Sequence, residues 1–166
     1  MPRNASSLYL IAQQCNFTGG GPQDGFSYDT QKHAVVRVMG GKELCVDATV
    51  PSELRLLPCD GTVAQQWKYA PSELPPSPAP DPPAPQPAEL RLISRPLDCI
   101  DIFCGPCHEG APVQAAPCHN GSNQLFTFGQ GMRDQMGQCL TAVGSPSEDP
   151  DSGARAKHAQ VGNLCN

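Results

Sequence analysis

Three aromatic triplets recur along this chain of 166 residues at a nearly constant interval. They are Phe26-Ser27-Tyr28, Trp67-Lys68-Tyr69 and Phe126-Thr127-Phe128. The first two lie 41 residues apart, and the last two lie 42 apart once a 17-residue proline-rich segment between them is left out. A fixed period of this length is typical of folds built from repeated supersecondary units. The chain is therefore predicted to contain three copies of one unit of about 40 residues.

Cysteine residues provide a second landmark with similar spacing. A Cys opens a short apolar segment in each unit, at Cys45, Cys99 and Cys139, and an alternating segment then runs into a second Cys at Cys59 and Cys118. Period-two alternation between glycine-rich turns indicates short β-strands. No amphipathic stretch is long enough to predict a helix. We therefore predict an all-β fold.

A proline-rich segment interrupts the repeat at residues 71–87, which hold nine of the chain's 19 prolines. Proline lacks the amide proton that a sheet ladder needs, so this segment is predicted to be polyproline II or irregular loop. We interpret it as a spacer within one domain that spans residues 1–166. Residues 144–157 are rich in Pro, Gly, Ser and Asp, which indicates a surface loop.

The nine cysteines favour a disulfide framework over a structural zinc site, because the four histidines show no ligand spacing. No metal site is expected. Three N-glycosylation acceptor triplets begin at Asn4, Asn16 and Asn120, and they agree with an oxidising compartment. We expect a secreted or extracellular protein. The odd cysteine count leaves one thiol without an internal partner.

Charge and motifs exclude several functions. A net charge of −5 provides no basic field, so no nucleic acid partner is expected. No apolar run approaches the roughly 20 residues of a membrane span. The first residues lack the apolar stretch of a signal peptide, which suits a mature chain or an excised piece of a larger one. No nucleophile–base pair or phosphate-binding glycine loop is present, so we expect no enzymatic activity and no cofactor.

One enzyme-like motif needs separate treatment. Residues Cys104-Gly105-Pro106-Cys107 spell the thioredoxin active-site tetrapeptide. A catalytic Cys-x-x-Cys requires a helix N-terminus that lowers the thiol pKa, whereas this one falls inside an all-β repeat. We expect instead that Cys104 and Cys107 form a small disulfide ring in a loop.

Two segments carry a resemblance to a known family. Cys-Val-Asp at 45–47, Leu-Leu-Pro-Cys-Asp-Gly at 56–61 and Gln65-Gln66-Trp67 resemble the ricin B-type lectins, whose lobes each end in a Gln-x-Trp signature. Gln124-Leu125-Phe126 repeats the signature with Phe in place of Trp. The resemblance implies a β-trefoil, in which three four-stranded lobes surround a pseudo-threefold axis. The aromatics Phe26, Trp67 and Phe126 would then lie in the core.

The resemblance implies that the lobes of this chain are in a permuted order. Residues 1–28 resemble the second half of a lobe, and residues 129–166 resemble a lobe that lacks its closing strand. In the complete lobes, the places three and five before the second Cys are apolar. Leu10 and Ala12 fill these places near the N-terminus, whereas Gln and Gly fill them near the C-terminus. We therefore predict that the N-terminal strand closes the third lobe.

This lobe assignment implies a set of cross-links. Within the two complete lobes, it pairs Cys45 with Cys59 and Cys99 with Cys118. The permuted closure pairs Cys15 with Cys139. In the alternative, Cys139 pairs with Cys165 and Cys15 is left over.

The resemblance also implies a sugar pocket in each intact lobe. The family uses an Asp two residues after the first Cys, a polar residue and an aromatic before the second Cys, and an Asn beside the signature Gln. Carboxylates and amides bind vicinal hydroxyls, and an aromatic ring covers the apolar face of the sugar. The 99–128 lobe has Asp101, Gln114 and Asn123 in these places, but Ala116 replaces the aromatic.

Asp47 is the matching carboxylate of the 45–69 lobe. Arg55, Leu57 and Ala64 occupy the other three places there, so the match is poorer. An Asp that follows a strand often bonds local backbone amides instead of a ligand. Asp47 is therefore a secondary candidate for sugar binding.

These observations predict a non-catalytic carbohydrate-binding module with one main, weak site at Asp101. Phe103 or His108 would supply the missing aromatic. The family resemblance implies a galactose-type glycan as the partner. The alternative is a degenerate trefoil that acts as a structural or protein-interaction domain of a larger secreted protein. The missing aromatics at Leu57 and Ala116 favour this alternative.

Overall fold

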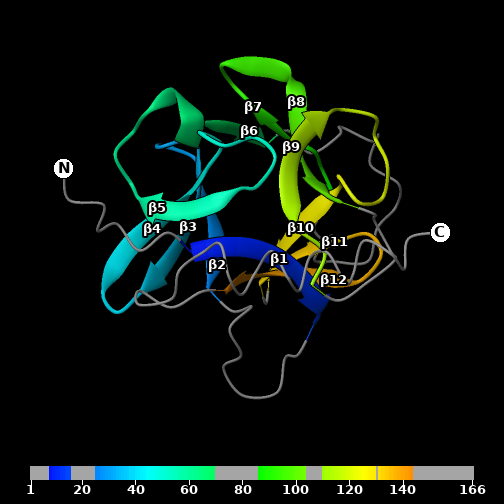
Figure 1. The fold of residues 1–166 in the computed structure, drawn as a ribbon, viewed down its shortest axis with the longest axis horizontal. Coiled ribbons are helices and arrows are strands. Elements are labelled where there is room, and N and C mark those ends of the chain that lie inside the picture. Colours follow the sequence, from blue (N-terminus) through cyan, green and yellow to red (C-terminus); the bar gives the residue numbers. More distant parts are fainter. Residues whose placement is uncertain (1–7, 16–24, 70–85, 104–109, 130, 144–166) are drawn as a thin grey trace, which may run out of the picture.

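The computed structural model describes residues 8–15, 25–69, 86–103, 110–129 and 131–143. The predicted all-β fold is confirmed, because these residues form twelve strands and one 3-10 turn (Figure 1). The elements are β1 Leu8–Gln14, β2 Phe26–Asp29, β3 Ala34–Met39, β4 Lys42–Asp47, β5 Arg55–Pro58, η1 Val63–Gln65, β6 Trp67–Tyr69, β7 Leu90–Leu92, β8 Arg95–Ile102, β9 Val113–Pro117, β10 Phe126–Gly129, β11 Gly131–Asp134 and β12 Gln138–Val143. The described residues contain no helix long and apolar enough to span a membrane.

The strands form two antiparallel sheets. The larger has the order β10-β11-β12-β1-β5-β4-β3-β2, and the smaller has the order β6-β7-β8-β9. Backbone hydrogen bonds join the sheets at their edges, where the Trp67 amide donates to the His33 carbonyl and Ala88 exchanges two bonds with Phe126. The two sheets together make a nearly closed, barrel-like structure.

Three segments meet in a cycle at the centre of this structure. The Leu10 amide donates to the Leu54 carbonyl at 3.2 Å, and the Leu54 amide donates to the Val113 carbonyl at 2.8 Å. The Ala12 amide closes the cycle by donating to the Ala111 carbonyl at 2.8 Å. Leu10, Leu54 and Val113 are fully buried, so each of the three segments supplies one apolar side chain to the core.

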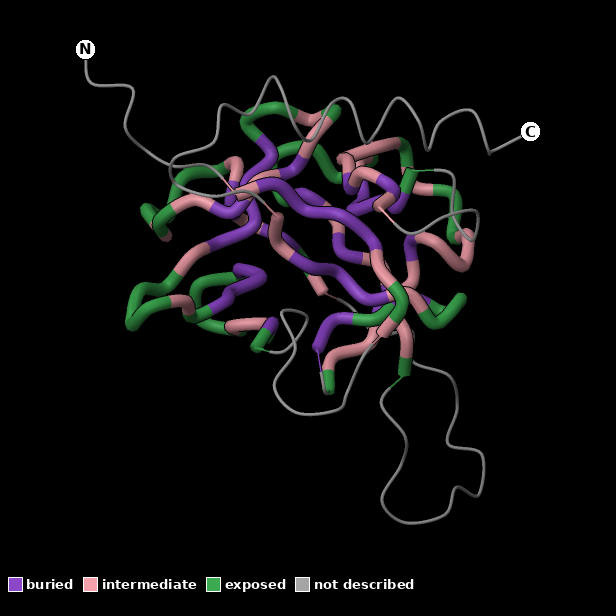
Figure 2. The backbone as a smooth tube through the Cα atoms, turned by 60° about the horizontal axis from the view of Figure 1, so that its bottom comes forward, coloured by how far each residue is buried: buried purple, intermediate pink, exposed green. Residues whose placement is uncertain are grey.

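The aromatic triplets lie on β2, β6 and β10, and their first residues are buried as predicted. Trp67 and Phe126 are fully buried, and Phe26 is 3% exposed. The indole of Trp67 also donates to the Val46 carbonyl at 3.0 Å, which satisfies its one polar atom. These rings are therefore part of the core. Figure 2 shows that buried residues gather toward the centre of the molecule, whereas exposed ones lie on its outer turns.

The last residues of the three triplets pack against one another. The ring centroids of Tyr28, Tyr69 and Phe128 are 5.1 to 6.3 Å apart, within the range of favourable aromatic pairs. The Tyr28 hydroxyl donates to the carbonyl of Trp67, and the Tyr69 hydroxyl donates to that of Phe126. Two triplets are thus each tied to the next by the same contact.

The N-terminal strand β1 lies between β12 and β5 (Figure 1). It pairs with β12 from Tyr9 to Gln14, with Ile11 opposite Thr141, and it meets β5 where Leu8 faces Leu56. Leu10 and Ala12 on β1 are fully buried. The strand that completes the sheet beside the last strand is therefore the first one in the sequence.

Three disulfides join strands that neighbour each other. They are Cys15–Cys139, Cys45–Cys59 and Cys99–Cys118, with Cα–Cα distances of 5.0, 5.0 and 5.1 Å. Of the two partners considered for Cys139, the structure thus contains Cys15. Cys104, Cys107 and Cys165 lie outside the described residues.

Most of the proline-rich segment also lies outside the described residues, as does the loop at 144–157. The last two residues of the segment are described and belong to the packed structure. The Tyr69 hydroxyl donates to the Gln86 carbonyl at 3.2 Å, and Pro87 precedes the buried Ala88. The backbone of Ala88 is hydrogen-bonded to that of Phe126. Gln86 and Pro87, which the sequence assigned to the spacer, therefore belong to the packed structure.

Candidate functional site

Strand pairing brings the first two candidate residues together. In the β8–β9 ladder, Asp101 lies directly opposite Gln114, so their side chains share one face of the sheet. Gln114 Nε2 donates to Asp101 Oδ1 at 3.1 Å. The Asp101 side chain is only 6% exposed, whereas Gln114 is half-buried.

The turn between β9 and β10 supplies two more amides. Asn123 Nδ2 donates to Asp101 Oδ2 at 3.0 Å and to the Ile102 carbonyl at 3.1 Å. Gln124 Nε2 donates to Asp101 Oδ2 at 2.8 Å and to the Pro117 carbonyl at 3.0 Å. The structure therefore gathers Asp101, Gln114 and Asn123 in one cluster, as their positions in the lobe predict, and adds Gln124.

His119 is a member of this cluster that the sequence did not predict. Its Nε2 atom lies 3.3 Å from Asp101 Oδ2, and its side chain is 54% exposed. The Gly121 amide donates to His119 Nδ1 at 3.1 Å, which makes Nδ1 the acceptor and places the proton of a neutral ring on Nε2. His119 directly follows the second Cys of its unit, and the matching place of the 45–69 unit holds Asp60. The repeat therefore gave no signal that pointed to His119. We name Asp101, Gln114, His119, Asn123 and Gln124 the Asp101 cluster.

The Asp101 cluster presents acceptors at its outer edge. Among the described residues, three donors converge on Asp101 Oδ2, whereas Oδ1 accepts from Gln114 alone. No described residue donates to Gln114 Oε1 or to Asn123 Oδ1. A carboxylate oxygen and two amide oxygens therefore retain lone pairs, and the chemical partners of such a set are hydroxyl or amide protons.

Asp47 on β4 has a similar set of contacts. Gln65 Nε2 donates to Asp47 Oδ2 at 3.2 Å and to the Pro58 carbonyl at 3.1 Å, and Gln124 makes the corresponding two bonds in the other unit. Asp47 is 4% exposed. In both units, the carboxylate thus anchors the Gln that precedes the buried aromatic.

The surroundings of Asp47 differ on its other side. The Thr49 amide donates to Asp47 Oδ1 at 2.8 Å, which is the local backbone bond expected of an Asp at a strand end. Arg55, which lies opposite Asp47, stacks over the ring of Tyr9 at 4.9 Å. Ala64 stands where the other unit has Asn123, and it has no side-chain amide. Asp47 therefore lacks the outward acceptors of the Asp101 cluster.

The third unit has no carboxylate at this place. Thr141 lies opposite Ile11 and is 1% exposed. Its hydroxyl oxygen has no partner among the described residues. An apolar neighbour and a buried hydroxyl do not make a hydroxyl-binding surface.

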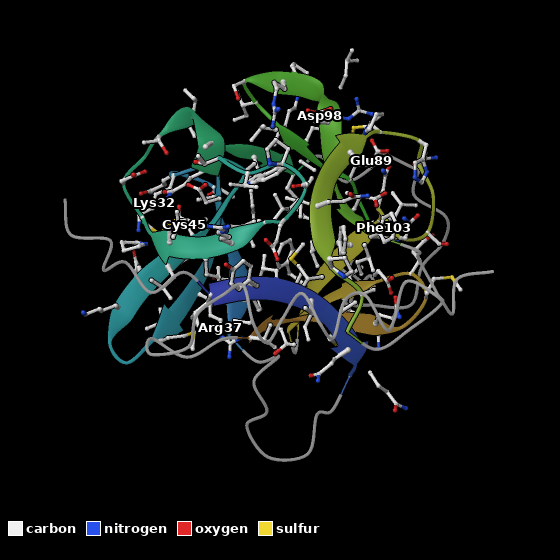
Figure 3. The ribbon with its side chains drawn as sticks, viewed as in Figure 1. Lys32, Arg37, Cys45, Glu89, Asp98 and Phe103 are labelled. Carbon is white, nitrogen blue, oxygen red and sulfur yellow. A yellow bond between two sulfur atoms is a disulfide. The ribbon has the colours of Figure 1, made fainter. Side chains whose placement is uncertain are left out.

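Phe103 follows the end of β8 and is 45% exposed (Figure 3). Its amide donates to the Pro112 carbonyl at 2.9 Å, which fixes the backbone two residues beyond Asp101. His108, the other candidate for the missing aromatic, lies outside the described residues. Phe103 is therefore the exposed aromatic that follows Asp101 most closely in the described chain.

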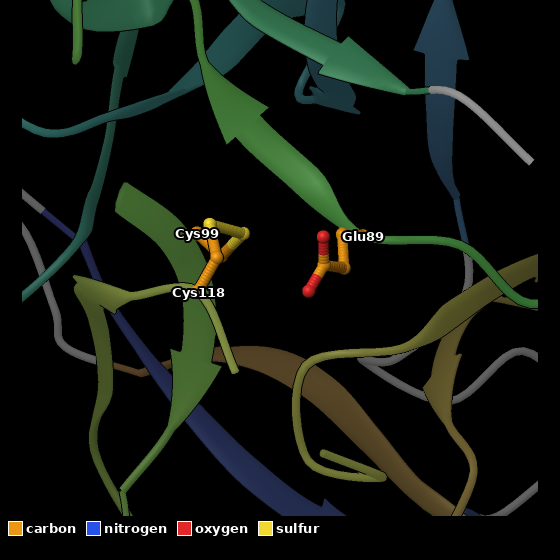
Figure 4. A group of neighbouring side chains, drawn as sticks. All are labelled: Glu89, Cys99 and Cys118. Atoms are coloured by element: carbon orange, nitrogen blue, oxygen red, sulfur yellow. A yellow bond between two sulfur atoms is a disulfide. The ribbon is translucent and has the colours of Figure 1, made fainter. Parts of the chain in front are cut away.

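Within the described part of the chain, three residues of types that can bind metals lie together: Glu89, Cys99 and Cys118 (Figure 4). Their potential ligand atoms are within 4.8 Å of one another. The two cysteines are joined in a disulfide, so neither can bind a metal as a thiolate. Glu89 accepts a hydrogen bond from the Asn120 amide and is paired with Arg91. This group is a structural contact between β7 and the β9–β10 turn.

Comparisons with known proteins give partial likenesses. No protein-family model matches the chain. A 48-residue segment is 46% identical to the ribosome-inactivating protein SNAI of Sambucus nigra and covers 28% of this chain but 8% of that protein. The solved structure of a mosquitocidal holotoxin aligns with a TM-score of 0.43 and 12% identity, over 90% of this chain and 18% of that one. The chain thus spans a small fraction of either relative.

Proposed function

We propose that this chain is a non-catalytic carbohydrate-binding module of the ricin B type, with one main sugar site at the Asp101 cluster. The observation that carries the proposal is the set of outward acceptors on Asp101, Gln114 and Asn123. The 48-residue similarity to a ribosome-inactivating protein agrees with the resemblance of the signature segments.

The fold that we propose is a single β-trefoil over residues 1–166, interrupted by the spacer and closed by its own N-terminus. The cyclic backbone bonds among the segments at Leu10, Leu54 and Val113 support it. The ring cluster formed by the last residues of the three triplets also supports it. Each feature draws one segment from each of the three proposed lobes, as a pseudo-threefold arrangement would.

In this proposal, the sugar is held by hydroxyl groups that donate to the cluster. Vicinal hydroxyls of a galactose-type sugar reach Asp101 Oδ1 together with an amide oxygen of Gln114 or Asn123. Ala116 leaves no aromatic platform on β9, and Phe103 provides the apolar contact instead. Because the site is shallow and the stacking surface is small, the affinity is weak.

We further propose that the protein is secreted or extracellular. The three disulfides of the described residues are of a kind that forms and persists in oxidising compartments. Whether it belongs to a larger chain does not affect the proposed site, because every residue of the Asp101 cluster comes from this domain.

A structural or protein-interaction domain is the second candidate. It is favoured by the hydrogen bonds that Asp101 already accepts within the domain, from the side chains of Gln114, Asn123 and Gln124. Asp47 accepts the same kind of hydrogen bond from Gln65. A carboxylate at this place of the unit therefore has a structural role that needs no ligand.

A pair of matched substitutions tests the proposal. Asp101→Ala and Asp47→Ala each remove one of the two acceptors of a buried Gln amide, which costs about 1–3 kcal/mol of stability. We expect Asp101→Ala to lose binding on a glycan array and in galactose and lactose titrations, while Asp47→Ala keeps wild-type binding. Gln114→Ala, at the half-buried edge, should weaken binding about tenfold with little change in melting temperature.

The outcomes separate the candidates. Equal loss of binding in both Asp variants would mean that sugar binding depends on the fold alone and not on the Asp101 cluster. A folded wild-type protein that binds no glycan would favour the structural domain.

A further inference from the structure

A second surface feature lies beside the β9–β10 turn, which also supplies residues of the Asp101 cluster. A cleft of about 210 Å³ runs along β6 and β7 and reaches the β9–β10 turn. Pro87, Ala88 and Leu125 give it apolar walls, and Lys68, Glu89 and Asn120 give it polar ones. It shares no residue with the Asp101 cluster.

Asn120 stands where the turn meets this cleft. It is exposed and has a φ of 58°, a left-handed conformation that Asn tolerates better than most residues. Its backbone amide donates to Glu89 Oε1 at 3.0 Å, which fixes the position of the turn. No described residue makes a hydrogen bond to its side-chain amide, so that group is available.

The sequence around Asn120 is the acceptor triplet Asn120-Gly121-Ser122. Such triplets are modified on the surface loops of secreted proteins. The other two triplets of this chain begin at Asn4 and Asn16, which lie outside the described residues. The cleft and the triplet are independent observations that meet at one side chain.

We propose that Asn120 is an N-glycosylation site and that the first sugar of its glycan packs in the cleft. The Asn120 Nδ2 atom forms a bond to the anomeric carbon of that sugar, and the bond from this carbon to the diphosphate of a lipid-linked oligosaccharide donor breaks. The diphosphate leaves with the bonding electrons, and the amide nitrogen loses one proton. This proposal is independent of sugar binding at Asp101.

The cleft suits one sugar residue in size and chemistry. Its volume is below the roughly 300–1,000 Å³ of pockets for drug-sized ligands. The exposed ammonium of Lys68 has no ion pair among the described residues and can donate to sugar oxygens, whereas Glu89 can accept from hydroxyls. Leu125 and Pro87 can cover the apolar face of the ring.

The first experiment tests the modification. The full chain is secreted from a eukaryotic cell line, and the peptide that contains Asn120 is analysed by mass spectrometry. We expect a glycan there in the wild type and in Ser122→Thr, which keeps the triplet, and none in Ser122→Ala. A folded, secreted wild type with an unmodified Asn120 would overturn the proposal.

The second experiment tests the seating of the sugar, in an Asn4→Gln, Asn16→Gln background. An endoglycosidase that leaves a single sugar on Asn120 gives the one-sugar protein, and Asn120→Asp gives a sugar-free protein that tolerates the same backbone conformation. We expect the one-sugar protein to melt about 2 °C or more higher. Lys68→Ala should reduce this gain, whereas Lys42→Ala on the β3–β4 hairpin should not. Equal melting temperatures for the one-sugar and sugar-free proteins would show that the sugar does not pack in the cleft.

Discussion

At Gly121, the absence of a side chain allows two groups to reach Asp101. A Cβ atom at this position would lie 2.5 Å from His119 Cε1 and 2.8 Å from Asn123 Oδ1. Real Cβ contacts are almost never shorter than 3.0 Å, so a larger residue would displace both side chains. Gly121 therefore controls the packing of the turn that forms one side of the Asp101 cluster.

Gly121→Ala tests this dependence. We expect the melting temperature to fall by about 2–4 °C, which corresponds to roughly 1 kcal/mol for a domain of this size, and galactose binding to weaken. Gly129→Ala is the control, because nothing lies within 4 Å of a Cβ there. Thermal melts and titrations of both variants are the measurement. Similar behaviour of the two variants would contradict the close packing at Gly121.

Asp134 is a buried acid at the end of β11. It is 3% exposed, and its Oδ2 atom has no partner among the described residues. Burial raises the pKa of Asp134 above its ordinary value of 3.8, although the amides of Gln138 and Met136 donate to Oδ1 and oppose this effect. Between 3.8 and the raised pKa, the folded chain binds more protons than the unfolded chain, so stability falls as the pH rises through this interval.

Asp134→Asn removes this titration. We expect the melting temperature of the wild type, relative to that of the variant, to rise when the pH is lowered from 7 to 4. Asp60→Asn is the opposite case, because the amide of Thr62 lowers the pKa of the exposed Asp60, so the wild type should lose stability relative to this variant as the pH falls from 3.8 toward the lowered pKa. Parallel pH profiles for wild type and Asp134→Asn would argue against a raised pKa.

At the scale of elements, β1 stabilises the structure far from its place in the sequence. It pairs with β12, the last described strand, and the disulfide at its end joins Cys15 to Cys139 across 124 residues. In the chain-entropy model, a cross-link that closes so long a loop stabilises more than one that closes 14 residues, as Cys45–Cys59 does. β1 is therefore a core strand and not a tail.

Leu10→Ala measures the contribution of β1. Leu10 is fully buried, and truncation of such a side chain lowers the free energy of unfolding by about 2–5 kcal/mol. Leu97→Ala is the matched control, because Leu97 is 78% exposed and should change stability by less than about 0.5 kcal/mol. Urea unfolding of both variants gives the values. A small effect at Leu10 would mean that β1 is not part of the core.

At the scale of the whole molecule, the packed structure resumes just before β7. Tyr69 at the end of β6 pairs with Leu90 on β7, and its hydroxyl contacts Gln86. The two ends of the proline-rich segment are therefore close together. A short connection can join them, because loop length affects stability only logarithmically.

Replacement of residues 72–84 by four Gly and Ser residues tests this conclusion. We expect the melting temperature to change by less than about 2 °C, since each halving of loop length is worth about 0.6 kcal/mol. Leu90→Ala, in the neighbouring β7, should lower stability by about 2–5 kcal/mol, because Leu90 is fully buried. A large loss on shortening would show that the replaced residues contribute to folding.

The sequence alone determined the features that repeat or alternate locally. Alternating segments predicted strands because successive side chains of a strand point to opposite faces. The family resemblance of the Gln-x-Trp segments predicted the burial of Phe26, Trp67 and Phe126. The family resemblance placed Asp101, two residues after Cys99, and Gln114, four residues before Cys118, in one group.

Only the tertiary structure decided the contacts that join distant or unrepeated residues. Spacing left Cys139 with two possible partners, and the pairing of β1 with β12 brings Cys15 to it. His119 reaches Asp101 because a left-handed residue at Asn120 and a bare Gly121 turn the chain back on itself. Such contacts depend on where separate strands and turns meet in space, and residue periodicity carries no information about that.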